Sequence, residues 1–151
     1  MRTHIVAVGR LKRGAEASLY EHFADRVRPP IQLHEVEVRK ADDKSRRKRE
    51  AELITAAIPD GATIVALDET GRNLASREFA KRLSNWRDTG TNELVFIIGG
   101  ADGLTDEIRN KATLVMSFGK WTWPHLLVRG MLAEQLYRAQ QIRAGHPYHR
   151  D

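Results

Sequence analysis

Short runs of β-branched and apolar residues alternate along the chain with stretches whose apolar residues repeat every three or four positions. The runs cover 5–8, 31–38, 63–67, 94–98 and 114–118, and the helical stretches cover 16–28, 43–58, 76–86, 105–112 and 126–142. This alternation predicts parallel strands joined by crossover helices, because parallel neighbours need a long connection. The run 31–38 alternates with period two, which predicts a strand near a sheet edge. The sequence therefore predicts one α/β domain over residues 1–151, with a mostly parallel sheet covered by helices on both faces.

The composition narrows the class of partner. The 25 Lys and Arg residues outnumber the 20 Asp and Glu residues, and the net charge of +5 favours an anionic partner such as a nucleic acid. The absence of cysteine excludes thiolate catalysis and Cys-ligated zinc. The apolar runs are far shorter than the ~20 residues that span a bilayer, and the first residues lack the pattern of a signal peptide. We therefore expect a cytoplasmic protein with no membrane partner.

Three loops at the predicted carboxyl ends of strands are the expected place for a ligand. They cover residues 67–71, 99–103 and 118–124. Glycines in the second loop could let backbone amides cradle a ligand, although a tight turn with nothing bound would look the same. The loop does not match the dinucleotide-binding pattern and lacks its acidic partner about 20 residues on, which disfavours a nucleotide enzyme of Rossmann type. Trp121 and Trp123 in the third loop could stack on a base or fill a core or an oligomer interface.

A strongly basic run occupies residues 39–49. It carries seven Lys or Arg residues among eleven. A solvated helix face is the usual meaning of such a run, and a surface that follows the phosphates of a nucleic acid is the functional alternative. The sequence leaves both interpretations open.

The last helix and the tail after it concentrate charged and aromatic groups. Glu134 and Arg138 are spaced to form an i,i+4 ion pair on the polar side of the helix. The segment 145–151 adds rings and cations that can stack on bases and contact phosphates, although a frayed terminus is the simpler alternative. His146 and His149 have no carboxylate at a ligand spacing, so we expect no metal site.

Five segments taken together resemble one protein family. They are Leu67-Asp68 with Gly71, Ile98 to Leu104, Trp123 to Arg129, Glu134 to Ala139, and the ending His146-Pro-Tyr-His-Arg150. The chain is similar to the small SPOUT-class methyltransferases that modify N3 of a pseudouridine in the 23S ribosomal RNA of bacteria. It departs from the family pattern at Ala101-Asp102, where Pro-Glu is usual, and at Trp121 and Trp123, where the family loop is aliphatic.

The resemblance implies an α/β SPOUT methyltransferase fold with a C-terminal trefoil knot. It implies S-adenosylmethionine as the methyl donor, no metal, and a homodimer in which one subunit's cofactor pocket meets the other's tail. The implied partner is 23S ribosomal RNA within the ribosome, and not DNA. A non-catalytic ribosome- or RNA-binding factor is the alternative.

The resemblance also implies roles for individual residues. The implied cofactor contacts are Leu67, Gly99, Gly100, Phe118, Gly119, Lys120, Trp121, Thr122, Trp123 and Pro124. The implied catalytic set, which supplies cations and a proton acceptor, comprises Arg129, Glu134, Arg138, His149 and Arg150. His125, His146 and Tyr148 are expected to contact RNA.

Overall fold

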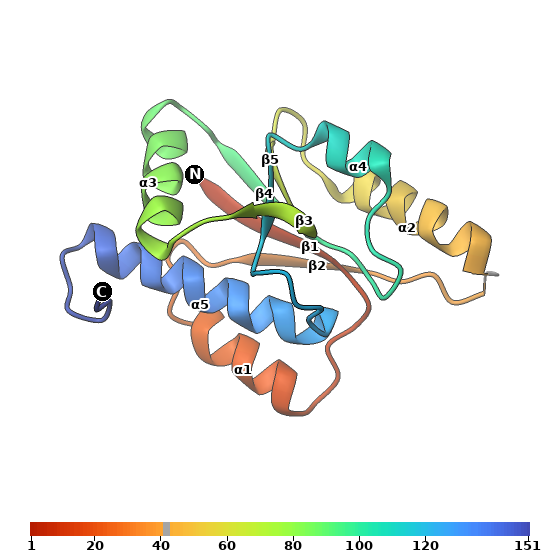
Figure 1. Cartoon of the computed structure of the whole chain (residues 1–151), viewed down its shortest axis with the longest axis horizontal. Helices are drawn as coiled ribbons and strands as arrows, with labels where there is room; N and C mark the ends of the chain where they lie inside the picture. Colours follow the sequence, from red (N-terminus) through yellow and green to blue (C-terminus); the bar gives the residue numbers. More distant parts are fainter. Residues whose placement is uncertain (41–42) are drawn as a thin grey trace.

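The computed structural model describes residues 1–40 and 43–151, which form one five-stranded sheet flanked by helices (Figure 1). The elements in chain order are β1 (Arg2–Val8), α1 (Ala15–Ala24), β2 (Gln32–Val36), α2 (Asp43–Ala57), β3 (Thr63–Asn73), α3 (Ser76–Asp88), β4 (Glu93–Ile98), α4 (Asp106–Lys111), β5 (Leu114–Ser117) and α5 (His125–Arg143). The strand order is β2-β1-β4-β3-β5, and every pairing is parallel. The predicted α/β class with a parallel sheet is confirmed.

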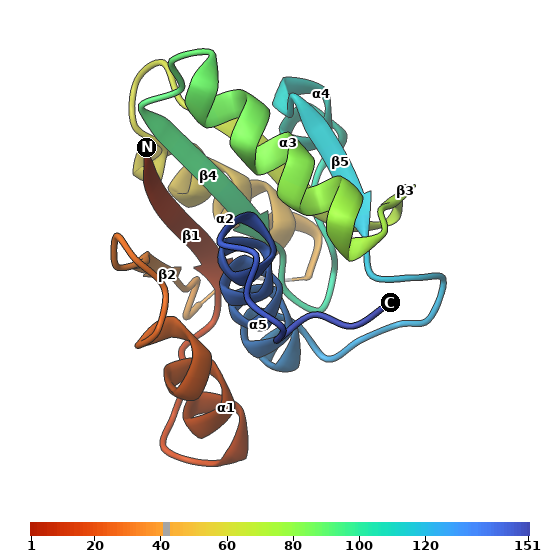
Figure 2. The same ribbon diagram turned by 90° about the vertical axis from the view of Figure 1, so that its left-hand side faces the viewer.

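The sheet separates two apolar cores. Side chains of α1, α3 and α5 pack on one face, with Tyr20, Phe79 and Leu132 among the buried residues. Ala51 of α2 and Ile108 of α4 pack on the other face. Figure 2 shows α5 crossing its face of the sheet between α1 and α3. Helices on both faces leave the ends of the strands as the part of the sheet where a ligand can enter.

Strand β3 is longer than its apolar run predicts. The segment 68–71, expected as an exit loop, continues the strand, and Arg72 pairs with Met116 after an irregularity in the register. At this point a Cβ on Gly71 would lie 2.6–2.8 Å from backbone atoms of Met116. Only glycine permits that approach, so Gly71 lets β3 bend around β5. The edge position predicted for 31–38 is confirmed by β2.

Two helix termini differ from their sequence signals. Helix α1 ends at Ala24 rather than at Arg28, because Gln140 of α5 binds both the backbone N–H and the carbonyl of Arg28. Ser76 does not cap α3, because its hydroxyl donates instead to Gln135 of α5 at 2.8 Å. Thr105 does cap α4 through the Ile108 N–H. Long-range contacts with α5 override the local signals in the first two cases.

Within the described part of the chain, no helix is long and apolar enough to cross a membrane. The trefoil knot stays a prediction of the resemblance.

Candidate functional site

A cleft of about 630 Å³, in the range typical of small-molecule sites, opens at the carboxyl ends of β4 and β5 and beside residues 67–69 of β3. It is lined by residues of the three segments singled out in the sequence, of which the first belongs to β3 and is not a loop, together with His125 and Val128 at the start of α5. Nine of the ten implied cofactor contacts line it: Leu67, Gly99, Gly100, Phe118, Gly119, Trp121, Thr122, Trp123 and Pro124. Lys120 is exposed and is not part of the lining. The topology thus brings together segments that lie about 50 residues apart.

The charge of the cleft is opposite to the charge of the protein. Asp68, Glu69 and Asp102 belong to the lining, and of the described residues that form it none is Lys or Arg. These acids were not predicted as site residues, although Asp68 directly follows the apolar run 63–67 and Asp102 lies in the glycine loop after β4. Arg109 lies behind Asp68 and pairs with it at 3.3 Å but does not line the cleft. The described lining residues therefore present carboxylates and no Lys or Arg side chain, which favours a cationic ligand over a nucleotide with several phosphates.

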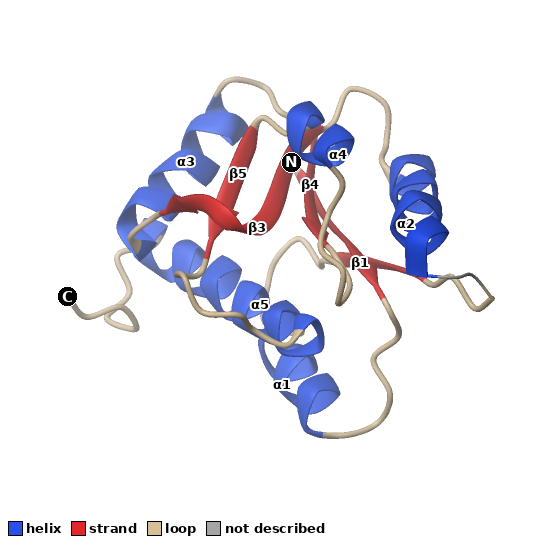
Figure 3. Ribbon diagram, turned by 45° about the vertical axis from the view of Figure 1, so that its right-hand side comes forward, coloured by secondary structure: helices blue, strands red, loops and turns tan. Residues whose placement is uncertain are grey.

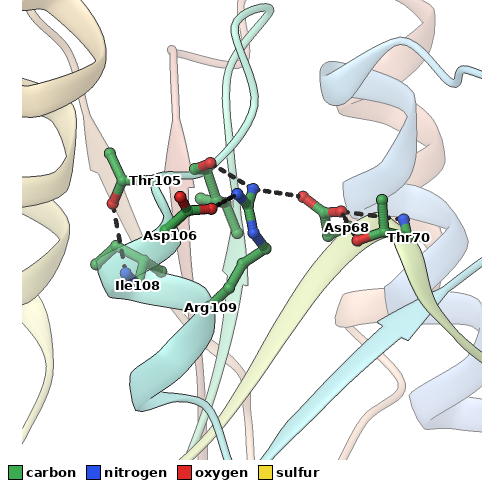
Figure 4. A network of polar contacts seen from close by, with 7 residues as sticks. Asp68, Thr70, Thr105, Asp106, Ile108 and Arg109 are labelled. Atoms are coloured by element: carbon green, nitrogen blue, oxygen red, sulfur yellow. Dashed lines mark hydrogen bonds and ion pairs between the residues drawn. The ribbon is translucent and has the colours of Figure 1, made fainter.

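A network of polar contacts fixes Asp68 in its ionised form (Figure 4). Thr70 donates to its carboxylate from the hydroxyl at 2.6 Å and from the backbone N–H at 3.0 Å, and Arg109 lies 3.3 Å away. Burial would raise the pKa of Asp68, but the Thr70 bonds and the Arg109 charge outweigh it and hold the pKa below the ordinary value. Arg109 also binds Asp106 and the Leu104 carbonyl, so the network ties β3 to the glycine loop.

The glycines of the loop after β4 are needed for packing inside the protein. A Cβ on Gly99 would lie 3.0 Å from atoms of Gly103 and Leu104, and one on Gly100 would lie 2.9 Å from Val8. A larger residue at either position therefore displaces the loop from within. The shape of the cleft therefore depends on Gly99 and Gly100, because they allow the loop to pack in this position.

Arg129 lies beneath the cleft and is fully buried, with 0% of its surface exposed. Its guanidinium donates to the Val8 and Gly9 carbonyls at 2.8 and 2.7 Å and to Glu35 at 2.7 Å. A side chain held in this way cannot reach RNA, so the structure gives Arg129 a positioning role in place of the predicted substrate contact. It joins the ends of β1 and β2 to α5.

His125 lies one helical turn before Arg129 and lines the cleft, where the sequence had predicted an RNA contact. Its Nε2 would be 3.3 Å from a Cβ on Gly9, so the glycine leaves room for the ring. Burial, followed by the charge of Arg129, lowers the pKa of His125 below 6.5. His125 is therefore neutral at pH 7, and the negative potential of the cleft is preserved.

We expect the affinity for a cationic ligand to be constant between pH 8 and the ordinary histidine pKa of 6.5 and to fall at lower pH. The reason is that His125 becomes protonated only below 6.5, and its new charge then repels the ligand. Calorimetric titration with S-adenosylmethionine from pH 8 to pH 5 measures this. His125→Gln should remove the decrease, and the control His146→Gln, outside the cleft, should leave it; equal profiles for both variants would contradict the prediction.

The C-terminal tail, residues 145–151, folds back onto α5 (Figure 2). Glu134 accepts from Arg138 at 2.5 and 2.9 Å and from the Tyr148 hydroxyl at 3.0 Å. Arg138 in turn lies 3.2 Å from Nδ1 of His149 and over the Tyr148 ring. Four of the implied functional side chains are thus gathered in one network, and the predicted Glu134–Arg138 ion pair is confirmed.

Asp151 anchors the end of the tail. Its carboxylate accepts from Arg77 of α3 at 2.7–2.9 Å and lies 3.0 Å from Nε2 of His149. His146 and Arg150 are exposed beside this network. The tail is therefore held in place, unlike a frayed terminus, and presents a ring and a cation to solvent.

The tail network and the cleft lie apart within one chain. Glu134 follows His125 by nine residues on α5, and a rise of 1.5 Å per residue separates them by about 13 Å along the axis. Figures 1 and 3 show the tail at one end of the molecule, beyond the far end of α5. Among the described residues no group of His, Asp and Glu is arranged to hold a metal ion.

Comparisons with known proteins agree with this geometry. Residues 1–149 match the family model described as a predicted SPOUT methyltransferase. The chain is 55% identical to the ribosomal RNA large subunit methyltransferase H of Rhodospirillum centenum and 52% identical to that of Paramagnetospirillum magneticum, with 99% of each chain covered.

Two solved structures share the fold at 14% sequence identity. A probable methylase family protein from Haemophilus influenzae matches 99% of this chain and 70% of its own with a TM-score of 0.60. The SpoU methyltransferase AviRb from Streptomyces viridochromogenes, solved in complex with AdoMet, matches 92% of this chain and 57% of its own with a TM-score of 0.50. From the family model and the full-length relatives, the chain belongs to the SPOUT methyltransferase family.

Proposed function

We propose that this protein transfers a methyl group from S-adenosylmethionine to N3 of a pseudouridine in the 23S RNA of the large ribosomal subunit, in the cytoplasm. The names of the full-length relatives support the ribosomal RNA substrate. The observation that carries the proposal is the acidic cleft, free of Lys and Arg among its described lining residues, in a protein of net charge +5. Such a cleft suits a sulfonium cation, while the excess of Lys and Arg outside the cleft suits RNA.

The residues of the cleft fit this cofactor. Apolar side chains of three strands, Leu67, Ile98 and Met116, can receive its hydrophobic parts together with Phe118 just after β5, and the loop backbone offers polar groups. Trp121 and Trp123 lie with ring centroids 6.1 Å apart on the loop before α5, where a purine ring could stack on them. When bound, the cofactor supplies an electrophilic methyl group, so the protein mainly has to position N3 of the base.

The tail network supplies the acid–base chemistry. N3 of a pseudouridine carries a weakly acidic proton that must leave before the nitrogen can attack. Arg138 and Arg150 are cations that stabilise the resulting anion, and Glu134 or His149 accepts the proton. Tyr148 and His146 are rings on which an exposed base can stack. Arg129 makes no contact with the substrate in this scheme; it holds α5, which carries Glu134 and Arg138, against the ends of β1 and β2.

The active form is a homodimer. The tail network and the cleft are separated along α5, so one chain alone does not place them together. Trp121 and Trp123 are 76% and 37% exposed, and a second apolar hollow of about 270 Å³ lies between α1 and α5. A second copy would cover this surface and bring its own tail to the cleft.

Ligand selectivity separates this proposal from its two alternatives. We expect calorimetry to detect binding of S-adenosylmethionine and no binding of NAD or ATP, because phosphates would meet the three carboxylates of the cleft. NAD or ATP binding would instead favour a nucleotide-dependent enzyme. Failure of all three ligands to bind would favour the non-catalytic RNA-binding factor.

A further inference from the structure

The excess positive charge of the chain is confined to residues 39–49. This run holds seven of the 25 Lys and Arg residues and two of the 20 Asp and Glu residues, so the rest of the chain carries 18 of each sign. Residues 41–42 of the run lie outside the described part of the structure. Six of the seven cations are exposed: Arg39, Lys40, Lys44, Arg47, Lys48 and Arg49.

The side chains in the first two turns of α2 do not pack into the apolar core. Lys44, Arg47, Ala51 and Ile54 recur at spacings of three and four and share one stripe of the helix. Ala51 and Ile54 are buried, whereas Lys44 and Arg47 on the same stripe are exposed. The start of α2 therefore projects beyond the sheet, as Figures 1 and 3 show at the end opposite the tail. Packing does not explain why this projecting part is basic.

The same helix is attached to the cleft. Glu50, the residue after the run, is only 6% exposed, and its Oε1 would lie 3.5 Å from a Cβ on Gly100 of the glycine loop. Ala51 and Ile54 share a core with Leu104 at the end of that loop. Arg49 donates to the Lys40 carbonyl at 3.3 Å, which ties residue 40 to the helix. The cations are thus fixed beside the cleft, on the side of the sheet away from α5.

We propose that these cations form a docking surface for the sugar–phosphate backbone of RNA, next to the cofactor cleft. This inference rests on the proposed function and adds to it how the substrate is held. Phosphate contacts need only Lys and Arg, and they position a nucleic acid without reading its sequence. The run contains no large apolar residue, whereas the centre of a protein interface is usually apolar and depleted in Lys. The surface therefore fits RNA better than a protein partner.

The test compares Arg47→Gln/Lys48→Gln with the control Arg26→Gln/Lys81→Gln, which removes the same charge from exposed positions just after α1 and on α3. Binding to naked 23S RNA is measured from 50 to 500 mM salt. The test variant should lose roughly tenfold to a hundredfold in affinity at 0.1 M salt, and its log–log salt slope should flatten by about two units, one per lost phosphate contact. The control should behave as wild type, and both should bind S-adenosylmethionine normally.

An unchanged affinity and slope for the test variant would overturn the docking surface. So would a loss that is seen with intact large subunits but not with naked RNA, because it would assign the surface to a ribosomal protein. A wild-type protein that fails to methylate large subunits would instead contradict the proposed function. The two failures are therefore distinguishable.

Discussion

Deleting residues 148–151 should abolish methylation of large ribosomal subunits and leave the affinity for S-adenosylmethionine unchanged. The tail carries Tyr148, His149 and Arg150 and lines no part of the cleft of its own chain. Its loss therefore removes RNA and proton-transfer contacts, together with the Asp151–Arg77 pair, and leaves the residues of the cofactor cleft in place. We expect methyl transfer to fall by about a thousandfold or more, the combined effect of losing acid–base and electrostatic groups. Radiolabelled methyl transfer and calorimetry measure the two quantities. Arg150→Gln should show a large part of the loss, and Arg143→Gln, its charge-matched control at the end of α5, should show none.

The same deletion tests the shared site. Gly100→Val should disable the cleft, because its side chain would clash with Val8 and displace the loop. Each variant alone should be inactive, and coexpression should restore about a quarter of the wild-type activity, because half of the dimers are mixed and each has one intact site. No recovery in purified mixed dimers would mean that each tail serves the cleft of its own chain.

Replacing Arg129 with Met should destabilise the fold by about 3 kcal/mol. The buried guanidinium makes three hydrogen bonds, and its removal leaves the Glu35 carboxylate and two backbone carbonyls without their donor. Urea denaturation measures the free energy of unfolding. Arg129→Lys should recover only part of the loss, since an ammonium cannot replace the planar fork of donors.

Arg143→Met on the exposed end of the same helix is the matched control and should change the free energy of unfolding little. If Arg129→Met were as stable as wild type but inactive, the positioning role would be wrong and the predicted substrate contact would be restored.

The sequence predicts the elements of the fold well where local signals and packing agree. The buried runs at β1 and β4 and the stripe of α5 are examples, since each is set by its own apolar pattern. The end of α1 and the role of Ser76 depend on Gln140 and Gln135, which lie more than 50 residues away. No local pattern contains that information.

The site follows the same rule. The three segments that line the cleft could be placed from the sequence because parallel strands bring their carboxyl ends to one edge, although the first of them continues β3 and is not a loop. The burial of Arg129 could not, because it depends on Glu35 and the end of β1. The acidic character of the cleft was also missed, since Asp68 and Asp102 come to line one cleft only after folding. The sequence alone left open whether the basic run 39–49 is a solvated helix face or a surface for phosphates. The structure adds that its cations lie around the start of α2, near the cleft.

The most direct test of the central claim is methyl transfer followed by mass spectrometry of the RNA. Large subunits from bacteria that lack the enzyme would be incubated with this protein and S-adenosylmethionine, and the 23S RNA would be digested and mapped. We predict one N3-methylated pseudouridine, absent when the Gly100→Val or tail-deleted protein is used. Cofactor binding without any methylated pseudouridine would contradict the proposed reaction.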